Sequence, residues 1–174
     1  MNLALTGFMG AGKTTTGRRL ARLLGIAFID TDAEIERRHG PIGDIFKVQG
    51  EPEFRKIEAA LIAELSRAGP HVMAVGGGAV LDARNRHELR RGGVIVHLAV
   101  SPQSAWRRVS HRRHRPLLGE QPGLVTLTAL LEARATAYAD CDLTIGVDHR
   151  TPLGAARIIA RWYEDELNRR IQKR

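Results

Sequence analysis

A glycine-rich segment near the start of the chain, GFMGAGKTTTG at residues 7–17, contains the residue types best suited to binding phosphate. Gly7, Gly12, Lys13 and Thr14 match the pattern G-x-x-x-x-G-K-[ST]. The glycines let successive backbone N–H groups surround an anion, and a helix that begins here adds the positive end of its dipole. The segment predicts a nucleoside triphosphate site built by Gly10, Ala11, Gly12, Lys13, Thr14 and Thr15, but it does not identify the acceptor.

Two carboxylates, Asp30 and Asp32, follow the next apolar run, IAFID at residues 26–30. Beside a phosphate site, one carboxylate could hold Mg²⁺ through water together with the Thr14 hydroxyl, and the other could take the proton of a hydroxyl nucleophile. An Asx turn that caps a helix is the structural alternative, and it can coexist with such a role.

Arg55 and Glu58 are three residues apart and share one face of a predicted helix. Such a pair is by default a surface ion pair of little energetic consequence. An arginine fork is also the group that binds a carboxylate-bearing acceptor. The triple glycine Gly76–Gly78 follows an apolar strand, where it permits a ligand to approach the main chain closely; a tight turn is the alternative.

These residues must be positioned by short apolar runs that alternate with segments of helical period. We expect strands at residues 2–6, 26–30, 71–75, 94–100 and 142–147, and helices at 13–25, 51–69 and 152–169. Continuous apolar strands are typical of a parallel sheet buried on both faces by helices. Ligands in such folds lie beyond the carboxyl ends of the strands, where the glycine segment, the aspartates and the triple glycine would meet.

Within the helices, the expected inward-facing residues recur at helical spacing. They are Leu20, Leu23 and Leu24 in the first helix; Phe54, Ile57, Leu61, Ile62 and Leu65 in the second; and Ala156, Ile159, Tyr163 and Leu167 in the last. Phe46 and Phe54 could also form walls around an acceptor, although both are compatible with a purely structural role.

The composition limits the class of protein. A chain of 174 residues with 43% hydrophobic residues is about one domain with a real core, and the single cysteine, Cys141, cannot form an internal disulfide. We expect no signal peptide or membrane span, and the cytoplasm as the compartment. The formal charge of +8 attracts polyanions, so a nucleic-acid-binding P-loop protein is a rival hypothesis, but aromatics for base stacking make up only 5%.

Five further segments occur in a fixed order after the glycine-rich one: FIDTDAEIE, GEPEFRKIE, VGGGAV, RPLL and EARATAYADCDLTI. Together they resemble the shikimate kinase family over nearly the whole chain, from Leu3 to about Arg157. The resemblance implies an α/β P-loop kinase fold of three layers, with a central five-stranded parallel sheet, helices on both faces and a mobile lid loop. It implies one domain over residues 1–174, an acceptor-binding segment at 31–62 and a lid at 109–121.

The resemblance also implies a reaction, the transfer of the γ-phosphate of ATP to the 3-hydroxyl of shikimate with Mg²⁺. The shikimate-binding residues would be Asp32, Arg55, Gly76, Gly77, Gly78 and Arg134. Asp32 would hold and activate the hydroxyl, Asp30 would lie nearer the metal, and Glu58 would orient Arg55. Without the resemblance, Arg134 reads as an ordinary helix-surface arginine.

On the donor side, the resemblance assigns catalysis to Lys13 and to Arg115 of the basic lid segment RRVSHRRHRPLLG. Arg108 would flank the adenine, and Arg150 is similar to the family's arginine on that side. The expected partners are ATP and shikimate, with no nucleic acid and no membrane, and a monomer is the simplest state. A P-loop kinase of another sugar acid, such as gluconate, is the alternative enzyme.

Overall fold

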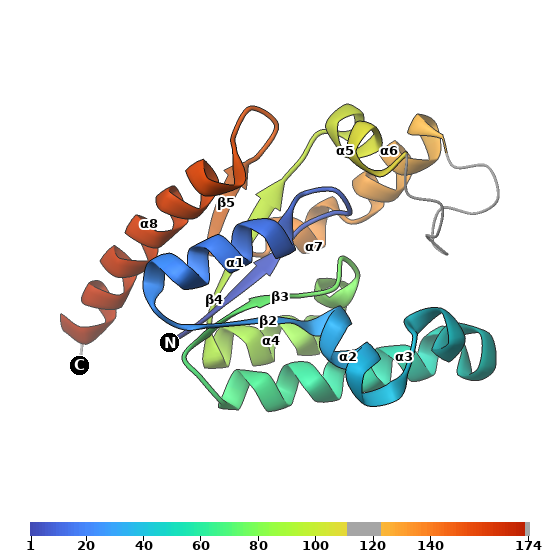
Figure 1. The fold of residues 1–174 in the computed structure, drawn as a ribbon, viewed down its shortest axis with the longest axis horizontal. Helices are drawn as coiled ribbons and strands as arrows, with labels where there is room; N and C mark the ends of the chain where they lie inside the picture. Colours follow the sequence, from blue (N-terminus) through green and yellow to red (C-terminus); the bar gives the residue numbers. More distant parts are fainter. Residues whose placement is uncertain (111–122, 173–174) are drawn as a thin grey trace.

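A computed structural model of the chain describes residues 1–110 and 123–172 (Figure 1). Five strands form one sheet in the order β2-β3-β1-β4-β5, and every neighbouring pair is parallel. Their bounds are Asn2–Thr6 for β1, Ala27–Asp30 for β2, His71–Ala74 for β3, Gly93–Ala99 for β4 and Leu143–Gly146 for β5. The predicted α/β fold with a five-stranded parallel sheet is confirmed, and each predicted strand end lies within one residue of the observed one.

Helices cover both faces of the sheet, as predicted. α1 packs against α8 on one face, and α2, α3 and α4 pack on the other, as right-handed crossovers require (Figure 1). The helices are α1 Lys13–Leu24, α2 Thr31–His39, α3 Ile42–Arg67, α4 Ala83–Gly92, α5 Pro102–Val109, α6 Leu124–Ala133, α7 Ala135–Ala139 and α8 Pro152–Gln172, with the 3₁₀ turn η1 at Ala79–Leu81. Among the described residues, none of these helices is long and apolar enough to span a membrane.

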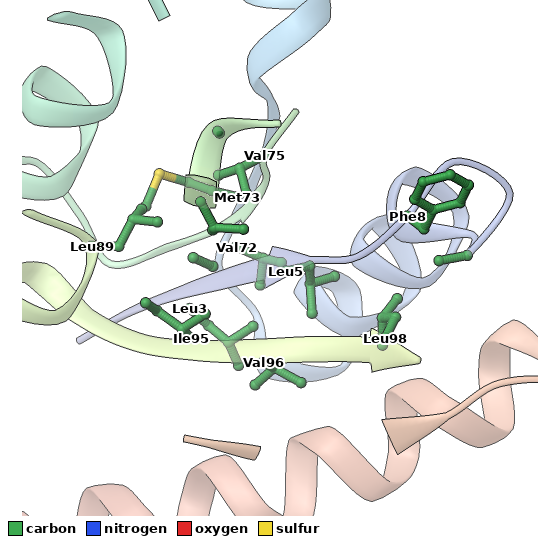
Figure 2. Packing of buried hydrophobic residues seen from close by; sticks show 14 of the residues in the cluster. Leu3, Leu5, Phe8, Val72, Met73, Val75, Leu89, Ile95, Val96 and Leu98 are labelled. Atoms are coloured by element: carbon green, nitrogen blue, oxygen red, sulfur yellow. The ribbon is translucent and has the colours of Figure 1, made fainter. Parts of the chain in front are cut away.

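The core lies on the three central strands. Figure 2 shows Leu3 and Leu5 of β1 packed with Val72 and Met73 of β3 and with Ile95 of β4, all of them buried. The edge strands β2 and β5 are only partly buried. The expectation that every strand is buried on both faces therefore holds for the centre of the sheet and is wrong at its edges.

The predicted inward stripe of the first helix is partly wrong. Leu20 is fully buried and Leu24 packs at the edge of the core, but Leu23 is 47% exposed. The buried face of α1 runs through Gly17 and Ala21, which places Leu23 at its margin. In α8 the expected stripe is confirmed, with three residues buried and Leu167 partly buried.

The predicted helix at residues 51–69 is the second part of a longer element. α3 begins at Ile42 and is interrupted at Gly50, whose φ of 80° and ψ of 169° are not helical. Pro52 then lies in the first turn of the second part, where a missing N–H costs nothing. The bend at Gly50 brings Ile42 and Phe46 of the first part to the same pocket as Phe54 of the second.

Candidate active site

The glycine-rich segment forms the loop between β1 and α1, at the carboxyl edge of the sheet. Gly7, Gly10 and Gly12 all have positive φ, and a Cβ on Gly7 would lie 2.6 Å from the carbonyl oxygen of Leu98. Lys13 Nζ donates to the Gly7 carbonyl at 2.8 Å, so the lysine lies over its own loop. Phe8 and Met9, between the glycines of the loop, are buried in the core.

This loop forms the floor of a cleft of about 590 Å³. The lining includes Gly10, Gly12, Lys13, Thr14, Thr15, Asp30, Asp32 and Arg108, and so unites most of the predicted triphosphate site. An adjoining hollow of about 210 Å³ is lined by Ala11, Arg108 and Arg150. It thus brings together Arg108 and Arg150, the two arginines expected near the adenine.

Thr14 and Asp30 form a direct pair in this cleft. The Thr14 hydroxyl donates to Asp30 Oδ2 at 2.7 Å. Asp30 Oδ1 accepts from the backbone N–H of Ala33, so this carboxylate also caps α2. Asp30 therefore takes the capping role that was the structural alternative. A hydroxyl and a carboxylate beside a phosphate loop are the hard oxygen ligands that Mg²⁺ prefers.

Asp32 lies between two pockets and lines both of them. The residue as a whole is exposed, but its carboxylate lies within the walls of the cleft, close to Gly76. This burial raises the pKa of Asp32, as do the nearby carboxylates of Asp30 and Glu36, while the positive charges of Lys13 and Arg55 oppose the rise. A carboxylate with a raised pKa is better suited to accepting a proton than a fully solvated one.

The second pocket has a volume of about 130 Å³ and lies on the α3 side of Asp32. Phe46 and Phe54 form an apolar wall, with ring centroids 4.9 Å apart. Arg55, Glu58 and the triple glycine complete the lining, together with Ile42 and Asp32. Phe46, Phe54 and Arg55 thus line one pocket, and apolar walls with one guanidinium are chemically suited to a small carbocycle that bears a carboxylate.

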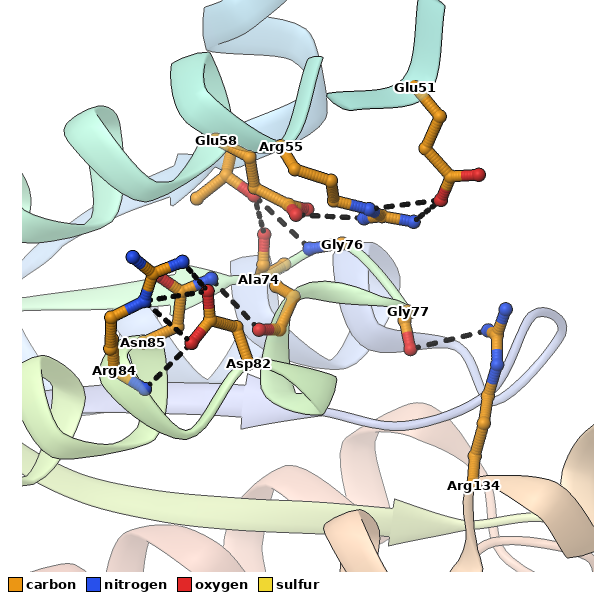
Figure 3. Close-up of polar contacts among 12 residues, drawn as sticks. Glu51, Arg55, Glu58, Ala74, Gly76, Gly77, Asp82, Arg84, Asn85 and Arg134 are labelled. Carbon is orange, nitrogen blue, oxygen red and sulfur yellow. Dashed lines mark hydrogen bonds and ion pairs between the residues drawn. The ribbon is translucent and has the colours of Figure 1, made fainter. Parts of the chain in front are cut away.

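Arg55 is fixed by glutamates of its own helix (Figure 3). Nη1 donates to Glu58 Oε2 at 2.8 Å, which is the orienting contact predicted for Glu58. Only 1% of the Glu58 side chain is exposed, and burial raises its pKa against the opposing hydrogen bond from Arg55. The pair is therefore largely removed from water, unlike the surface ion pair that the spacing alone suggests.

The triple glycine is needed because the side chains of the site approach it closely. A Cβ on Gly76 would lie 2.5 Å from Glu58 Oε1, and one on Gly78 would lie 2.7 Å from Arg55 Nη2. Sequence reasoning attributed these glycines to the approach of a ligand. In the structure, the ends of the Glu58 and Arg55 side chains already occupy the space that a Cβ would need at these two positions, so they would have to shift to admit one.

Two residues that hold this loop were missed as site residues by sequence reasoning. Thr31 Oγ1 accepts from the N–H of Gly76 and donates to the carbonyl of Ala74, both at 3.2 Å. The Tyr138 hydroxyl donates to the carbonyl of Gly77 at 2.7 Å. Thr31 belongs to the motif D-T-D and Tyr138 to the motif R-x-x-x-Y, but the spacing of these motifs does not indicate what either residue contacts.

Arg134 also points to this loop and is not a surface residue. It is only 6% exposed, lies over the ring of Phe8 and donates from Nη1 to the Gly77 carbonyl at 3.4 Å (Figure 3). The ring of Tyr138, which also contacts Gly77, stacks on His97. Burial and the positive charge of Lys13 lower the pKa of His97 to about 4, so this ring is neutral at neutral pH.

The remaining predicted residues lie on the donor side. Arg108 donates to the carbonyls of Gly10 and Val147, both at 3.0 Å, and so connects the phosphate loop to the segment after β5. Arg150 Nη1 donates to the Gly146 carbonyl at 2.8 Å. Arg115 lies outside the described residues, as does the predicted lid except for its first two positions, 109–110.

Comparison with known proteins gives consistent results. The family model described as "Shikimate kinase" matches residues 9–164. A shikimate kinase of Caldanaerobacter subterraneus subsp. tengcongensis is 41% identical over 163 residues, which cover 93% of this chain and 95% of the relative. One of Pseudomonas entomophila is 48% identical over 153 residues, covering 87% of this chain and 89% of the relative.

Solved structures agree with these sequences. The shikimate kinase of Acinetobacter baumannii in complex with shikimate superposes with a TM-score of 0.89 at 37% identity, covering 95% of this chain and 93% of that one. A gluconokinase of Sinorhizobium meliloti has a TM-score of 0.59 at 22% identity, with 97% of this chain and 96% of that one covered. The second likeness extends to the fold alone.

Proposed function

We propose roles for the residues of the site from one premise: this chain belongs to the shikimate kinase family. It is an ATP-dependent kinase that transfers the γ-phosphate of ATP to the 3-hydroxyl of shikimate, giving shikimate 3-phosphate and ADP. We assign some of its residues to the binding of each substrate and others to the reacting atoms.

The observation that carries these roles is the position of Asp32 between the phosphate cleft and the acceptor pocket. A group at that junction touches the acceptor hydroxyl on one side and faces the terminal phosphate on the other. We assign the two pockets accordingly, with ATP over the glycine loop and shikimate between Phe46, Phe54 and Arg55.

In this arrangement transfer is direct. The 3-hydroxyl oxygen forms a bond to the γ-phosphorus as the bond from that phosphorus to the bridging oxygen of ADP breaks, and Asp32 accepts the hydroxyl proton. Lys13 stabilises the charge on the transferring phosphoryl group. Arg115, from the segment outside the described residues, is proposed to add a second positive charge there.

The acceptor would be held at both ends. Arg55 and Arg134 bind its carboxylate, and the Gly76–Gly78 segment faces its ring hydroxyls. Arg108 and Arg150 bind the nucleotide on the far side of the loop.

We regard residues 1–174 as one kinase domain with its acceptor-binding segment at 31–62. We also propose a cytoplasmic monomer, with neither nucleic acid nor membrane as a partner.

The experiment that tests this function is a coupled assay of ADP release with shikimate or gluconate as the acceptor. We expect release that depends on shikimate, with gluconate a poor substrate. Faster turnover of gluconate would instead support the alternative acceptor. The comparison needs saturating ATP, so that only acceptor recognition separates the two rates.

Thr14 and Asp30 would hold Mg²⁺, which neutralises phosphate charge when it is bound. Removing divalent ions with a chelator should therefore stop turnover, and added Mg²⁺ should restore it. In Thr14→Val, which lacks the hydroxyl, the Mg²⁺ concentration for half-maximal ADP release should rise. An unchanged Mg²⁺ requirement in this variant would remove Thr14 from the metal site.

A further inference from the structure

The guanidinium of Arg55 is bonded to two glutamates at the same time. Its Nε and Nη2 donate to Glu51 Oε1 at 3.1 and 2.8 Å, and its Nη1 donates to Glu58 Oε2 at 2.8 Å. Figure 3 shows these two carboxylates on opposite sides of the guanidinium. Three of its five N–H donors are thus used before any acceptor arrives.

The two glutamates differ sharply in their exposure to solvent. Glu58 is 1% exposed, whereas 52% of the Glu51 side chain is accessible. Breaking the buried pair would leave a carboxylate without its partner inside the protein, which is strongly unfavourable. An exposed ion pair within a helix is weak, so Glu51 can turn into water at little cost.

The free end of the guanidinium faces the triple glycine. A Cβ on Gly78 would lie 2.7 Å from Nη2 and 2.8 Å from Nη1, so the guanidinium packs directly on this glycine, and both residues line the space of the acceptor pocket, which has a volume of about 130 Å³. A substrate carboxylate that enters this space meets two carboxylates already bonded to the same cation. Like charges at such distances oppose one another, and Glu51 is the one that can leave.

We propose that the Glu51 carboxylate competes with the acceptor carboxylate for Arg55. The affinity of the pocket for the acceptor is then lower than it would be if Arg55 were not bonded to Glu51. This inference rests on the proposed role of Arg55 as the ligand of the substrate carboxylate. Because phosphorylation of a hydroxyl leaves the carboxylate unchanged, Glu51 weakens binding of the substrate and of the product alike. It thereby speeds the release of shikimate 3-phosphate as well as limiting the capture of shikimate.

The test is equilibrium binding of shikimate and of shikimate 3-phosphate to Glu51→Gln, measured by calorimetry. Removal of one exposed charge should tighten the binding of both ligands by about two- to fivefold. ATP binding should stay unchanged. Thermal unfolding of the variant would verify that it is folded.

Glu53→Gln is the matched control. Glu53 is in the same helix, is 40% exposed and pairs with Lys56 at 2.9 Å, so its charge is bonded to a cation other than Arg55. We expect this variant to bind both ligands as the wild type does. A gain in Glu53→Gln equal to that in Glu51→Gln would show a general effect of net charge and would overturn the inference.

Salt distinguishes competition from a structural effect. Because Glu51 is exposed, its charge is screened, and the difference in affinity between the variant and the wild type should shrink near 1 M salt.

Unchanged or weaker shikimate binding by Glu51→Gln would overturn the inference, and weaker binding would make Glu51 a positioning residue for Arg55. Absence of shikimate binding by the wild type would overturn the acceptor assignment itself, and the inference with it.

Discussion

At the scale of single residues, the role proposed for Asp32 depends on its protonation state, because it is to take the proton of the acceptor hydroxyl. Burial raises the pKa of Asp32 above its ordinary value of 3.8, and the positive charge of Lys13 limits the rise. Only the ionised carboxylate can accept a proton. The required form is therefore present above the raised pKa and is lost as the pH falls through it.

We therefore expect an acid limb in the pH profile of kcat/KM for shikimate, with an apparent pKa above 3.8. The profile should be measured from pH 4 to 8 by ADP release. Aliquots returned to neutral pH must recover full activity, so that loss of rate is not unfolding. A flat profile across the acid range would mean that Asp32 positions the hydroxyl without taking its proton.

Tyr138 contributes through the loop that it holds. In Tyr138→Phe the Gly77 carbonyl loses its 2.7 Å hydrogen bond and keeps only the longer contact from Arg134. We expect a severalfold rise in KM for shikimate, little change in KM for ATP, and a loss of about 1 kcal/mol in the free energy of unfolding.

Tyr163→Phe is a suitable control for this prediction. Tyr163 is also buried, and its hydroxyl also donates to a backbone carbonyl, that of Met1, away from the site. This variant should lose stability to a similar extent but keep the KM for shikimate. Equal effects of both variants on KM would assign the change to stability alone.

At the scale of elements, the strand-to-turn segment after β3 and the bent helix α3 form the acceptor pocket together. The bend at Gly50 aims Phe46 at the pocket, and the second part of α3 presses Arg55 and Glu58 against the triple glycine. The width of the pocket is thus set by contact between a helix and a loop that lie apart in the sequence.

Gly78→Ala tests this contact. Its Cβ would meet the guanidinium of Arg55 at less than 3.0 Å, so Arg55 must shift and the space beside it must close. We expect KM for shikimate to rise about tenfold or more, with ATP binding unchanged. Gly43→Ala, where nothing lies within 4 Å of the new Cβ, should leave both constants unaltered. Normal shikimate kinetics in Gly78→Ala would contradict this view of the pocket.

At the scale of the whole molecule, the strand order places the carboxyl ends of β1, β3 and β2 side by side. The glycine loop, the triple glycine and the aspartates follow those three ends, so the topology alone brings donor and acceptor binding together. This convergence could be predicted from apolar runs and motifs, because parallel strands end at one edge of the sheet.

Other features could not be predicted in the same way. Three of them depend on how closely side chains pack in the folded protein. They are the need for glycine at position 76, the hydrogen bond from Tyr138 to Gly77, and the ion pair between Glu51 and Arg55. The break of α3 at Gly50 depends on a backbone conformation that glycine permits but does not require. Leu23 shows the same limit, since helical spacing alone does not locate the centre of a buried face.

The central claim is that Asp32 joins the two halves of the site. The most direct measurement is shikimate-dependent ADP release by Asp32→Asn, together with its affinity for ATP. We predict that turnover is lost while ATP binding is retained and the fold is at least as stable at neutral pH, because the variant lacks a carboxylate whose pKa is raised by folding. Turnover within a few-fold of the wild type would contradict the account.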